Sequence, residues 1–468
     1  DYKGENNMLY RFKEVRDIQE YTVAEIIAKI DEATTVNNTY ITLKDYYKGN
    51  SAILSRASAD AAKPNNKIVN NFAKYITDVN VGYFIGRPVT YTATGEGAEL
   101  KEILQDIFDY NDEQDENAQL AKVASIKGVA YELLYVDEEA NPRFNYVEPD
   151  NLILIYDKAI TPNPLMAIRY EQNDIASFAE LYTKTDIIYY ESGEDFKDLA
   201  EVSRMANPWG DIPVIEFLNN EEGMGDFETV LSEIDAYDKA QSDTANDFEY
   251  FADAYLLLKN LSGTSEDEIA SAKSKRVLLV DGDGDASWLT KTMQDTATEN
   301  YKTRLQTDIH RFSMTPNLTD ENFAGNLSGV ALEFKLWGLE QLAVYKERKF
   351  KRGLQRRIEL LCNFLKLKTG KEEDWRKINI NFTRNIPMNV PDMVDMVVKL
   401  NGILSQQTLL ARLPFIDDPA KELEQIEAES EGMVNLDLIP DEFVDNETPK
   451  IENENQATEE IPAEEATE

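Results

Sequence analysis

The chain has 468 residues, more than one compact core usually organises, and its 42% hydrophobic and 10% aromatic residues exclude wholesale disorder. Its 88 Asp and Glu residues against 48 Lys and Arg give a net charge of −40. Such a charge argues against tight binding of nucleic acid, because phosphate binding requires clustered cations.

Several classes of chemistry lack the residues they need. Cys362 is the single cysteine, which excludes a disulfide framework and fits a reducing compartment. His310 is the single histidine, so an HExxH zinc site cannot form, and neither a nucleophile elbow nor a GxxxxGK[ST] phosphate loop occurs. We therefore predict no catalytic residue, metal or cofactor, and a protein that is not an enzyme.

Neither a membrane span nor a secretion signal is predicted. No apolar run approaches the roughly 20 residues that a span needs, and the start lacks a signal-peptide pattern. Residues 1–7 are interpreted as a tag or processing remnant, with Met8 as the start.

The first half of the chain is predicted to be α+β. Apolar residues at helical spacing predict four helices, at 22–33, 66–84, 99–110 and 117–127. Between 130 and 191 the period shifts towards two, and Pro and Asn separate the apolar runs, as is typical of an antiparallel meander.

The centre is predicted to hold two helices around a small insertion. A stretch without proline or glycine predicts one helix over 226–258, and the capping-box pattern TATE predicts another from Thr296 to Phe312. The insertion 260–291 contains a predicted strand at 276–280 and the turn-rich DGDGD at 281–285.

The second half is predicted to be mostly helical. A polar loop at 316–327 precedes the longest predicted helix, 328–368. A strand at 377–383 and helices at 391–404, 406–413 and from Asp418 follow. Beyond about Gly432 the chain is acidic and poor in aromatics, which is typical of disorder; the segment 417–468 holds 19 acids and 2 bases.

Three motifs admit two interpretations each. The DGDGD run lacks the glycine and glutamate that an EF-hand loop starting at Asp281 requires, so a hairpin turn is favoured over calcium binding. The loop 316–327 is either an ordinary connection or a functional loop held by two rigid helices. The third motif has seven cations in 12 residues and is either a solvated helix face or a contact with nucleic acid or a neighbouring subunit, of which the neighbour is favoured: Lys346, Arg348, Lys349, Lys351, Arg352, Arg356 and Arg357.

The order of these elements resembles the SPP1-type family of phage portal proteins over residues 66–431. The likeness is most specific in NNKIVNNFAKYI ending at Ile76 with GRPV at 86–89, in NDFEYFADAY at 246–255, and in NLSGVALE at 326–333. The resemblance implies a mostly helical α+β fold with wing, stem, clip and crown, assembled as a dodecameric ring with a central channel for DNA packaging and ejection.

The resemblance also implies a division of the chain. The wing is expected at 1–225 and 328–390, the stem helices at 226–259 and 292–314, the clip at 260–291, the tunnel loop at 315–327 and the crown at 391–431, with an acidic tail at 432–468. Tunnel-loop residues expected to face DNA are Asn317, Thr319, Asp320, Glu321, Asn322, Phe323 and Asn326. Clip residues expected to dock the terminase are Glu266, Glu268, Lys275, Arg276, Asp281, Asp283 and Trp288.

The partners implied by the resemblance are other copies of the chain, the terminase large subunit, head-completion or adaptor proteins, major capsid and scaffolding proteins, and double-stranded DNA passing through the channel. The implied location is the capsid vertex of the virion, and the host cytoplasm during assembly. Two alternatives stay open: a metal-dependent nuclease, which needs converging carboxylates, and another capsid or connector component.

Overall fold

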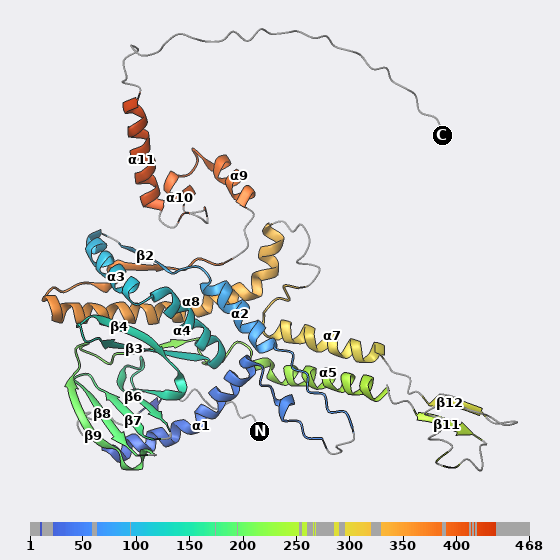
Figure 1. Ribbon diagram of the computed structural model, residues 1–468. Coiled ribbons are helices and arrows are strands. Elements are labelled where there is room, and N and C mark those ends of the chain that lie inside the picture. The colour runs from blue at the N-terminus through green and yellow to red at the C-terminus, as the bar shows by residue number, and fades with distance from the viewer. Residues whose placement is uncertain are drawn as a thin grey trace, which may run out of the picture. The chain divides into compact units, whose positions relative to one another are not determined.

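The computed structural model describes residues 10–11, 22–58, 63–93, 95–173, 175–193, 195–251, 255–259, 265, 267, 285–289, 295–319, 329–385, 390–410, 413, 416 and 419–436. The chain divides into two compact units, Asp1–Met388 and Asn389–Glu468. Helices and sheets are both present, with helix predominating, so the predicted α+β class is confirmed (Figure 1).

A six-stranded sheet forms one layer of the first unit. Its order is β1-β5-β6-β7-β8-β9, antiparallel from β5 onward, with β1 joining β5 in parallel. The bounds are β1 Tyr10–Arg11, β5 Leu152–Tyr156, β6 Pro164–Gln172, β7 Ser177–Tyr182, β8 Asp186–Ser192 and β9 Ala200–Ala206. The meander predicted over 130–191 is confirmed from β5 onward, and β9 extends it beyond the predicted range, whereas the strands at 129–136 and 142–147 belong to another sheet.

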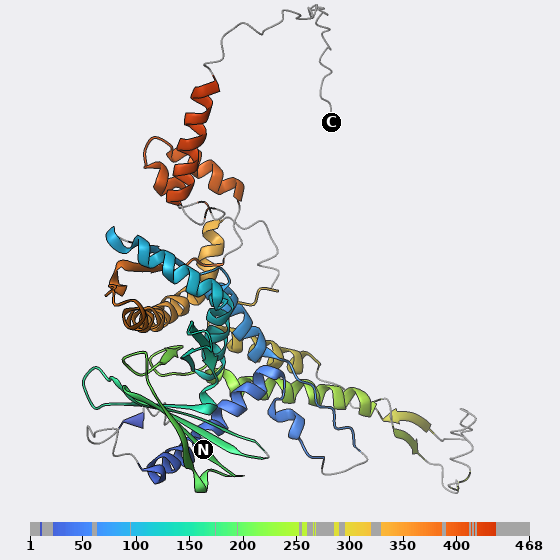
Figure 2. The same cartoon turned by 60° about the vertical axis from the view of Figure 1, so that its left-hand side comes forward.

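The two faces of this sheet are covered differently. Ile153 and Ile155 of β5 pack against Ile26 and Ile30 of α1 (Val23–Lys48). The alternate residues of β5 pack against a second sheet, because successive side chains of a strand point to opposite faces. Figure 2 shows α1 lying along the strands. Helix α1 is longer than predicted, since it continues through the polar stretch after Ala33 and ends at Gly49, whose φ is +85°.

The second sheet has the order β10-β3-β4, with β10 Val214–Leu218, β3 Val129–Val136 and β4 Pro142–Val147. Its outer face forms the largest core together with the long helix α8 (Gly329–Thr369). At Gly353 of α8 an added Cβ would lie 2.5 Å from a ring carbon of Phe217, so glycine allows helix and sheet to approach closely.

Three more helices and a two-stranded sheet also belong to the first unit. They are α2 Phe72–Ile85, α3 Ala98–Tyr110, α4 Glu113–Lys127, and β2 Thr90–Ala93 paired with β13 Ile378–Asn381. Helix α2 begins six residues later than the predicted 66–84 helix, because residues 66–71 have no regular secondary structure. Single 3-10 turns lie at Ala52–Ser55, Gly95–Gly97, Pro149–Asn151, Phe196–Asp198, Glu228–Val230 and Trp375–Lys377.

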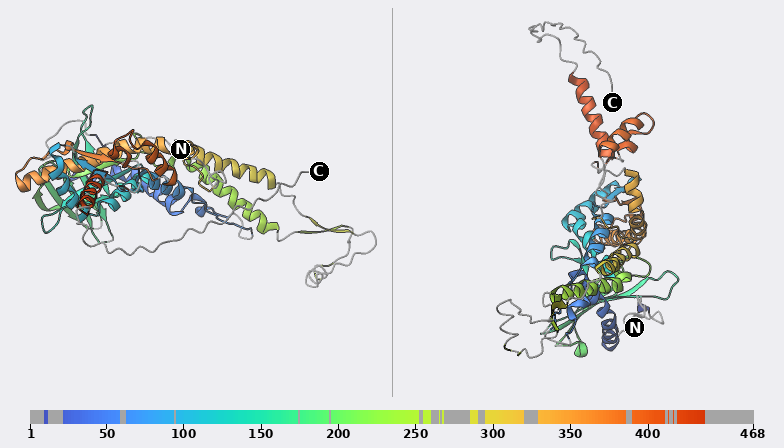
Figure 3. Two further views of the ribbon diagram at one scale, coloured as in Figure 1. Left: turned by 90° about the horizontal axis from the view of Figure 1, so that it is seen from above. Right: turned by 90° about the vertical axis from the view of Figure 1, so that its right-hand side faces the viewer.

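Two helices of the centre run side by side: α5 Leu231–Phe251 and α7 Asp295–Phe312 (Figures 1 and 3). The prediction of one helix over 226–258 was wrong at its end. Tyr255–Lys259 forms β11, which pairs with β12 Asp285–Leu289, because this short apolar run finds a partner strand across the insertion. The strand predicted at 276–280 lies outside the described residues.

The second unit contains α9 Val390–Leu400, α10 Gln406–Leu410 and α11 Pro419–Leu436. The helix predicted at 391–404 ends earlier than expected, where Gly402 adopts a φ of +83°. Helix α11 continues past Gly432, so the boundary predicted for the disordered tail was too early. Residues 437–468 lie outside the described part of the chain, as does the predicted cap Asp418.

Candidate functional site

The start of the polar loop after α7 is fixed to α2. The hydroxyl of Tyr75 donates to the carbonyl of Pro316 at 2.9 Å and accepts from the amide of Leu318 at 2.8 Å. Asn80, one turn further along α2, donates to the hydroxyl of Thr315 at 2.8 Å. The loop therefore leaves α7 from a rigid base built by two helices.

His310 completes the contacts that hold the start of the loop. Its Nδ1 lies 3.0 Å from the carbonyl oxygen of Thr315, and because a carbonyl only accepts, Nδ1 carries the proton. Phe72 and Tyr75 meet the imidazole edge to face. Burial lowers the pKa of His310, against the opposing effect of the bond to Thr315, so the ring is held neutral. Its role in this place is structural.

Only the beginning of the predicted tunnel loop is described. The side chain of Asn317 accepts from the amide and hydroxyl of Thr319, which stabilises a local turn at the exposed start of the loop. Asp320, Glu321, Asn322, Phe323 and Asn326 lie outside the described residues.

The same holds for most of the predicted clip residues. Trp288 lies in β12, where it is paired with Leu256 of β11. Glu266, Glu268, Lys275, Arg276, Asp281 and Asp283 lie outside the described residues.

An irregular segment before α2 is hydrogen-bonded along one face of α5. The amides of Asn66, Ile68 and Asn70 donate to side chains of α5 at 2.6, 2.9 and 2.7 Å. Their acceptors are spaced four residues apart: Asn246, Ser242 and Asp238. Alternate amides of this segment thus meet successive turns of α5, and we call this arrangement the 66–70 ladder.

The ladder extends into a wider polar cluster. The second carboxylate oxygen of buried Asp238 accepts from Ser51 at 2.7 Å. The side chain of Asn66 donates to Asn246 at 3.0 Å and to Glu249 at 2.7 Å. Prediction from sequence missed this cluster as a site, although the asparagine-rich run and the segment starting at Asn246 were both recognised as specific. Two spacings could have indicated the cluster. The bonded amides lie two residues apart in one segment, and their acceptors lie four residues apart in the other.

Within the basic segment of α8, Arg357 lies in the interior of the protein. Its guanidinium donates to Glu132 at 2.9 and 2.6 Å, to Glu113 at 2.9 Å and to Asn117 at 2.9 Å. The ring of Phe144 lies 4.5 Å away. Burial raises the pKa of Glu132, although Arg357 opposes that shift. The prediction of a subunit contact was wrong for Arg357, since the side chain is fully buried.

Lys346 is likewise internal, because it is buried and pairs with Asp226. Lys349 pairs with Glu221, and Arg356 bonds to Asp211 at 2.8 Å and to Glu359 at 2.7 Å. Arg348 and Arg352 are exposed, and Lys351 is half-buried. The seven cations therefore divide into two buried ones, three half-buried ones and an exposed pair, a distinction that the sequence alone does not show.

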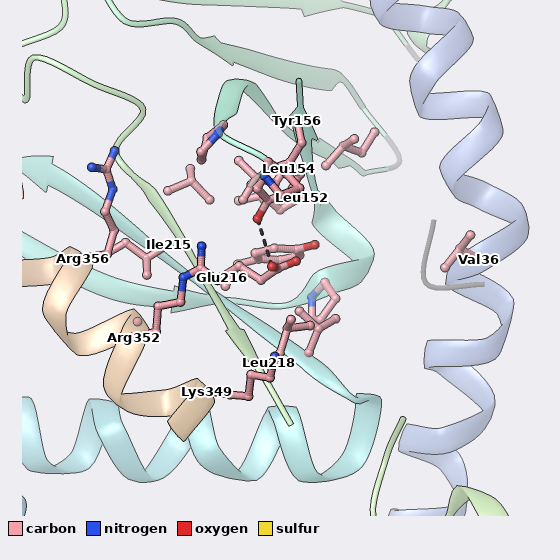
Figure 4. Close-up of a pocket in the computed structure, with 18 of the residues that line it drawn as sticks. Val36, Leu152, Leu154, Tyr156, Ile215, Glu216, Leu218, Lys349, Arg352 and Arg356 are labelled. Carbon is pink, nitrogen blue, oxygen red and sulfur yellow. Dashed lines mark hydrogen bonds between the residues drawn. The ribbon is translucent and has the colours of Figure 1, made fainter. Parts of the chain in front are cut away.

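A cavity of about 420 Å³ lies between α1, β5, β10 and α8 (Figure 4). Lys349, Arg352 and Arg356 border it from α8, and Glu216 of β10 accepts a 3.0 Å hydrogen bond from Tyr156. Burial raises the pKa of Glu216 to about 7, against the effects of Tyr156, Arg352 and Lys349. The cavity thus contains a carboxyl group that changes its protonation near neutral pH.

The described residues contain neither a metal-binding cluster nor a membrane-spanning helix. In that part of the chain no three His, Cys, Asp or Glu side chains converge as a metal site would require. Across the described helices none has the length and apolar character of a membrane span.

The family model for phage portal proteins of the SPP1 Gp6-like type matches residues 28–436. The chain belongs to this family. It is 29% identical over 414 residues to the portal protein of Bacillus phage SPP1, covering 83% of this chain and 81% of that protein. It is 26% identical over 447 residues to the portal protein of Clostridium phage phiCD119, covering 89% and 96%.

Two solved structures show a more distant likeness. One is the neck of a native GTA particle computed with C12 symmetry, with a TM-score of 0.45, 9% identity, and 74% of this chain and 90% of that chain covered. The other is the neck of an empty GTA particle computed with C6 symmetry, with a TM-score of 0.44, 11% identity, and 80% and 93% covered.

Family membership defines the role in outline. Phage portal proteins are structural components of the virion, assembled as oligomeric rings at the capsid vertex. The chain is accordingly a portal-type connector subunit of a tailed phage, as its sequence predicted.

Proposed function

We propose that twelve copies of the chain form a closed ring whose channel passes double-stranded DNA into the capsid during packaging and out of it during ejection. The observation that carries the proposal is the family match, which covers residues 28–436. The charge of −40 supports it, because an acidic channel does not hold DNA of like charge.

The proposed division of the chain follows the described elements. The wing comprises residues 1–225 and 328–390, and the stem is the pair α5 and α7 within 226–259 and 292–314. Because β11 pairs with β12, the hairpin belongs with the clip at 260–291, and the boundary between stem and clip falls just after Phe251. Helices α9, α10 and the first part of α11 form the crown at 391–431, and the acidic tail follows.

The tunnel loop at 315–327 is proposed to face the DNA. Its base on Tyr75, Asn80 and His310 keeps its first residues in a fixed place. Its side chains are polar or acidic apart from Pro316, Leu318, Phe323, Ala324 and Leu327, and it contains no cation. Such a loop touches the backbone transiently and reads no base sequence.

The proposed partners follow from the same role. The clip docks the terminase large subunit during packaging, and head-completion or adaptor proteins afterwards. The outer wing contacts major capsid and scaffolding proteins, and assembly takes place in the host cytoplasm. The chain itself hydrolyses nothing: the motor that it docks supplies the chemical energy.

Native mass spectrometry of the purified protein, with negative-stain images of the same sample, tests the proposal. We expect a closed ring of about twelve chains of 53.3 kDa with an open centre. If only monomers or dimers form even with scaffolding protein and DNA present, the ring proposal is wrong.

A further inference from the structure

Helix α8 has a second apolar face that points to solvent. Its described residues Leu336, Leu339, Phe350 and Leu354 are buried in the main core. On another face Phe334, Trp337 and Tyr345 are 75%, 62% and 61% exposed. Towards the C-terminal end of α8, this second face also carries polar and basic residues. We call the whole set the α8 stripe: Phe334, Trp337, Gln341, Tyr345, Arg348 and Arg352.

The spacing of the stripe places its members on one side of α8, which Figure 1 shows to be bent in its first part. Successive members are three or four residues apart, so each lies one helical turn beyond the last. The guanidinium of Arg348 lies 5.7 Å from the centre of the Tyr345 ring, which stiffens the middle of the stripe.

The composition of the stripe is that of a protein interface. Trp, Tyr and Arg are the residues enriched at the centres of protein–protein contacts, where large rigid side chains exclude water. Single exposed apolar residues are ordinary on protein surfaces, whereas several exposed aromatic side chains on one side of a helix mark a binding face.

DNA is a poorer partner for this face than protein. The bases of a duplex are stacked inside it, so aromatic rings cannot stack on them as they do on single strands. Phosphate binding needs several cations, and the stripe offers only Arg348 and Arg352 at one end.

We propose that a neighbouring copy of this chain in the ring binds to the α8 stripe. This inference rests on the proposed function. A copy with a net charge of −40 presents acidic groups to Arg348 and Arg352, while the aromatic half is covered by apolar surface. In a ring the contact is heterologous, so the stripe meets a different face of its neighbour and the arrangement closes after a full turn.

The experiment compares ring assembly of three proteins by native mass spectrometry over a series of concentrations. They are the wild type, the double variant Trp337→Ala with Tyr345→Ala, and the control Ile175→Ala with Val202→Ala. The control residues are exposed apolar side chains on another surface, at 84% and 58%. Circular dichroism and thermal unfolding of the monomers establish that each variant folds.

We expect the control to assemble as the wild type does, and the stripe variant to need at least about tenfold more protein for half-assembly. Rings of the stripe variant with unchanged concentration dependence overturn the stripe proposal and leave the ring proposal standing. Unchanged assembly with impaired DNA packaging also overturns it, since the stripe would then face DNA. A wild type that forms no ring contradicts the proposed function itself.

A second measurement does not depend on shortening side chains to alanine. A photo-crosslinking benzoylphenylalanine in place of Trp337 is expected to join two chains when the rings are irradiated. At position 175 the same group is expected to give none. Equal crosslinking from both positions, or none from position 337 in assembled rings, contradicts the proposal.

Discussion

Arg357 illustrates how a charged side chain can be retained inside a protein. Four hydrogen bonds to Glu132, Glu113 and Asn117 and the face of Phe144 surround a guanidinium that has no access to water. Tyr91 donates to the same Glu113, which shares the negative charge over a wider network. The network joins α8 to α4 and β3, three elements far apart in the sequence.

Removing this cation should be strongly destabilising. We predict that Arg357→Ala lowers the free energy of unfolding by about 3–5 kcal/mol, because Glu113 and Glu132 are left buried without their counter-ion. Urea unfolding at a fixed low protein concentration measures the change. Arg204→Ala is the matched control, since Arg204 pairs with Glu201 on the surface and should have little effect. Equal effects of the two substitutions would show that the network adds nothing.

Glu216 should make stability depend on pH. Its pKa is about 7 in the folded chain against 4.5 in a free side chain, so the unfolded chain loses its proton first as the pH rises. The contribution of Glu216 to the free energy of unfolding is therefore fully present below pH 4.5 and is lost as the pH rises through about 7. We predict that Glu216→Gln removes a part of this decline of the order of 1–2 kcal/mol.

The test is a pair of urea titrations, at pH 5 and at pH 8, for each protein. Glu102→Gln, a substitution of an exposed carboxyl group on α3, serves as the control and should follow the wild type. If the Glu216→Gln variant and the wild type lose equal stability between the two pH values, the cavity does not raise the pKa of Glu216.

At the scale of elements, the 66–70 ladder explains why a segment without regular secondary structure is so specific in sequence. Its amides have no strand to pair with among the described residues, and α5 supplies their acceptors instead. The bonds tie α5 to the segment that leads into α2, and α2 in turn holds the base of the loop after α7. The stem helices and the loop base thus share one support.

Removing the acceptors should release the segment. We predict that Ser242→Ala with Asn246→Ala makes the amides of Asn66 and Ile68 exchange with deuterium faster, because each acceptor lost leaves an N–H group without a partner, at about 1–3 kcal/mol. Hydrogen-exchange mass spectrometry of peptides covering 65–71 gives the readout. Lys239→Ala, an exposed change on the same helix, should leave exchange as it is. Unchanged exchange in the double variant would show that the ladder does not hold the segment.

At the scale of the whole molecule, much of the fold could be predicted from local pattern. The long helix α8, the helix α7 and the strands β3, β5, β6 and β8 all have strong periodicity, and each was found near its predicted place. The order of these elements also identified the family. A local sequence pattern is sufficient to predict an element whose hydrogen bonds form within the element itself.

Prediction failed where residues distant in the sequence determine the secondary structure of a segment or the burial of a side chain. Tyr255–Lys259 follows a helix without a break signal, and it becomes a strand because β12 pairs with it. The basic segment gave no sign that Arg357 is internal, since its carboxylate partners come from α4 and β3. The exposed α8 stripe was hidden for the same reason: an aromatic residue at helical spacing belongs to the core or to an interface according to what packs on it.

The most direct test of the ring account is electron cryomicroscopy of the assembled protein, reconstructed without imposed symmetry. We expect a ring of twelve copies around an open channel, with the loop after α7 at its wall and the α8 stripe covered by a neighbour. A closed particle with no channel, or copies related by a two-fold axis alone, would contradict the account.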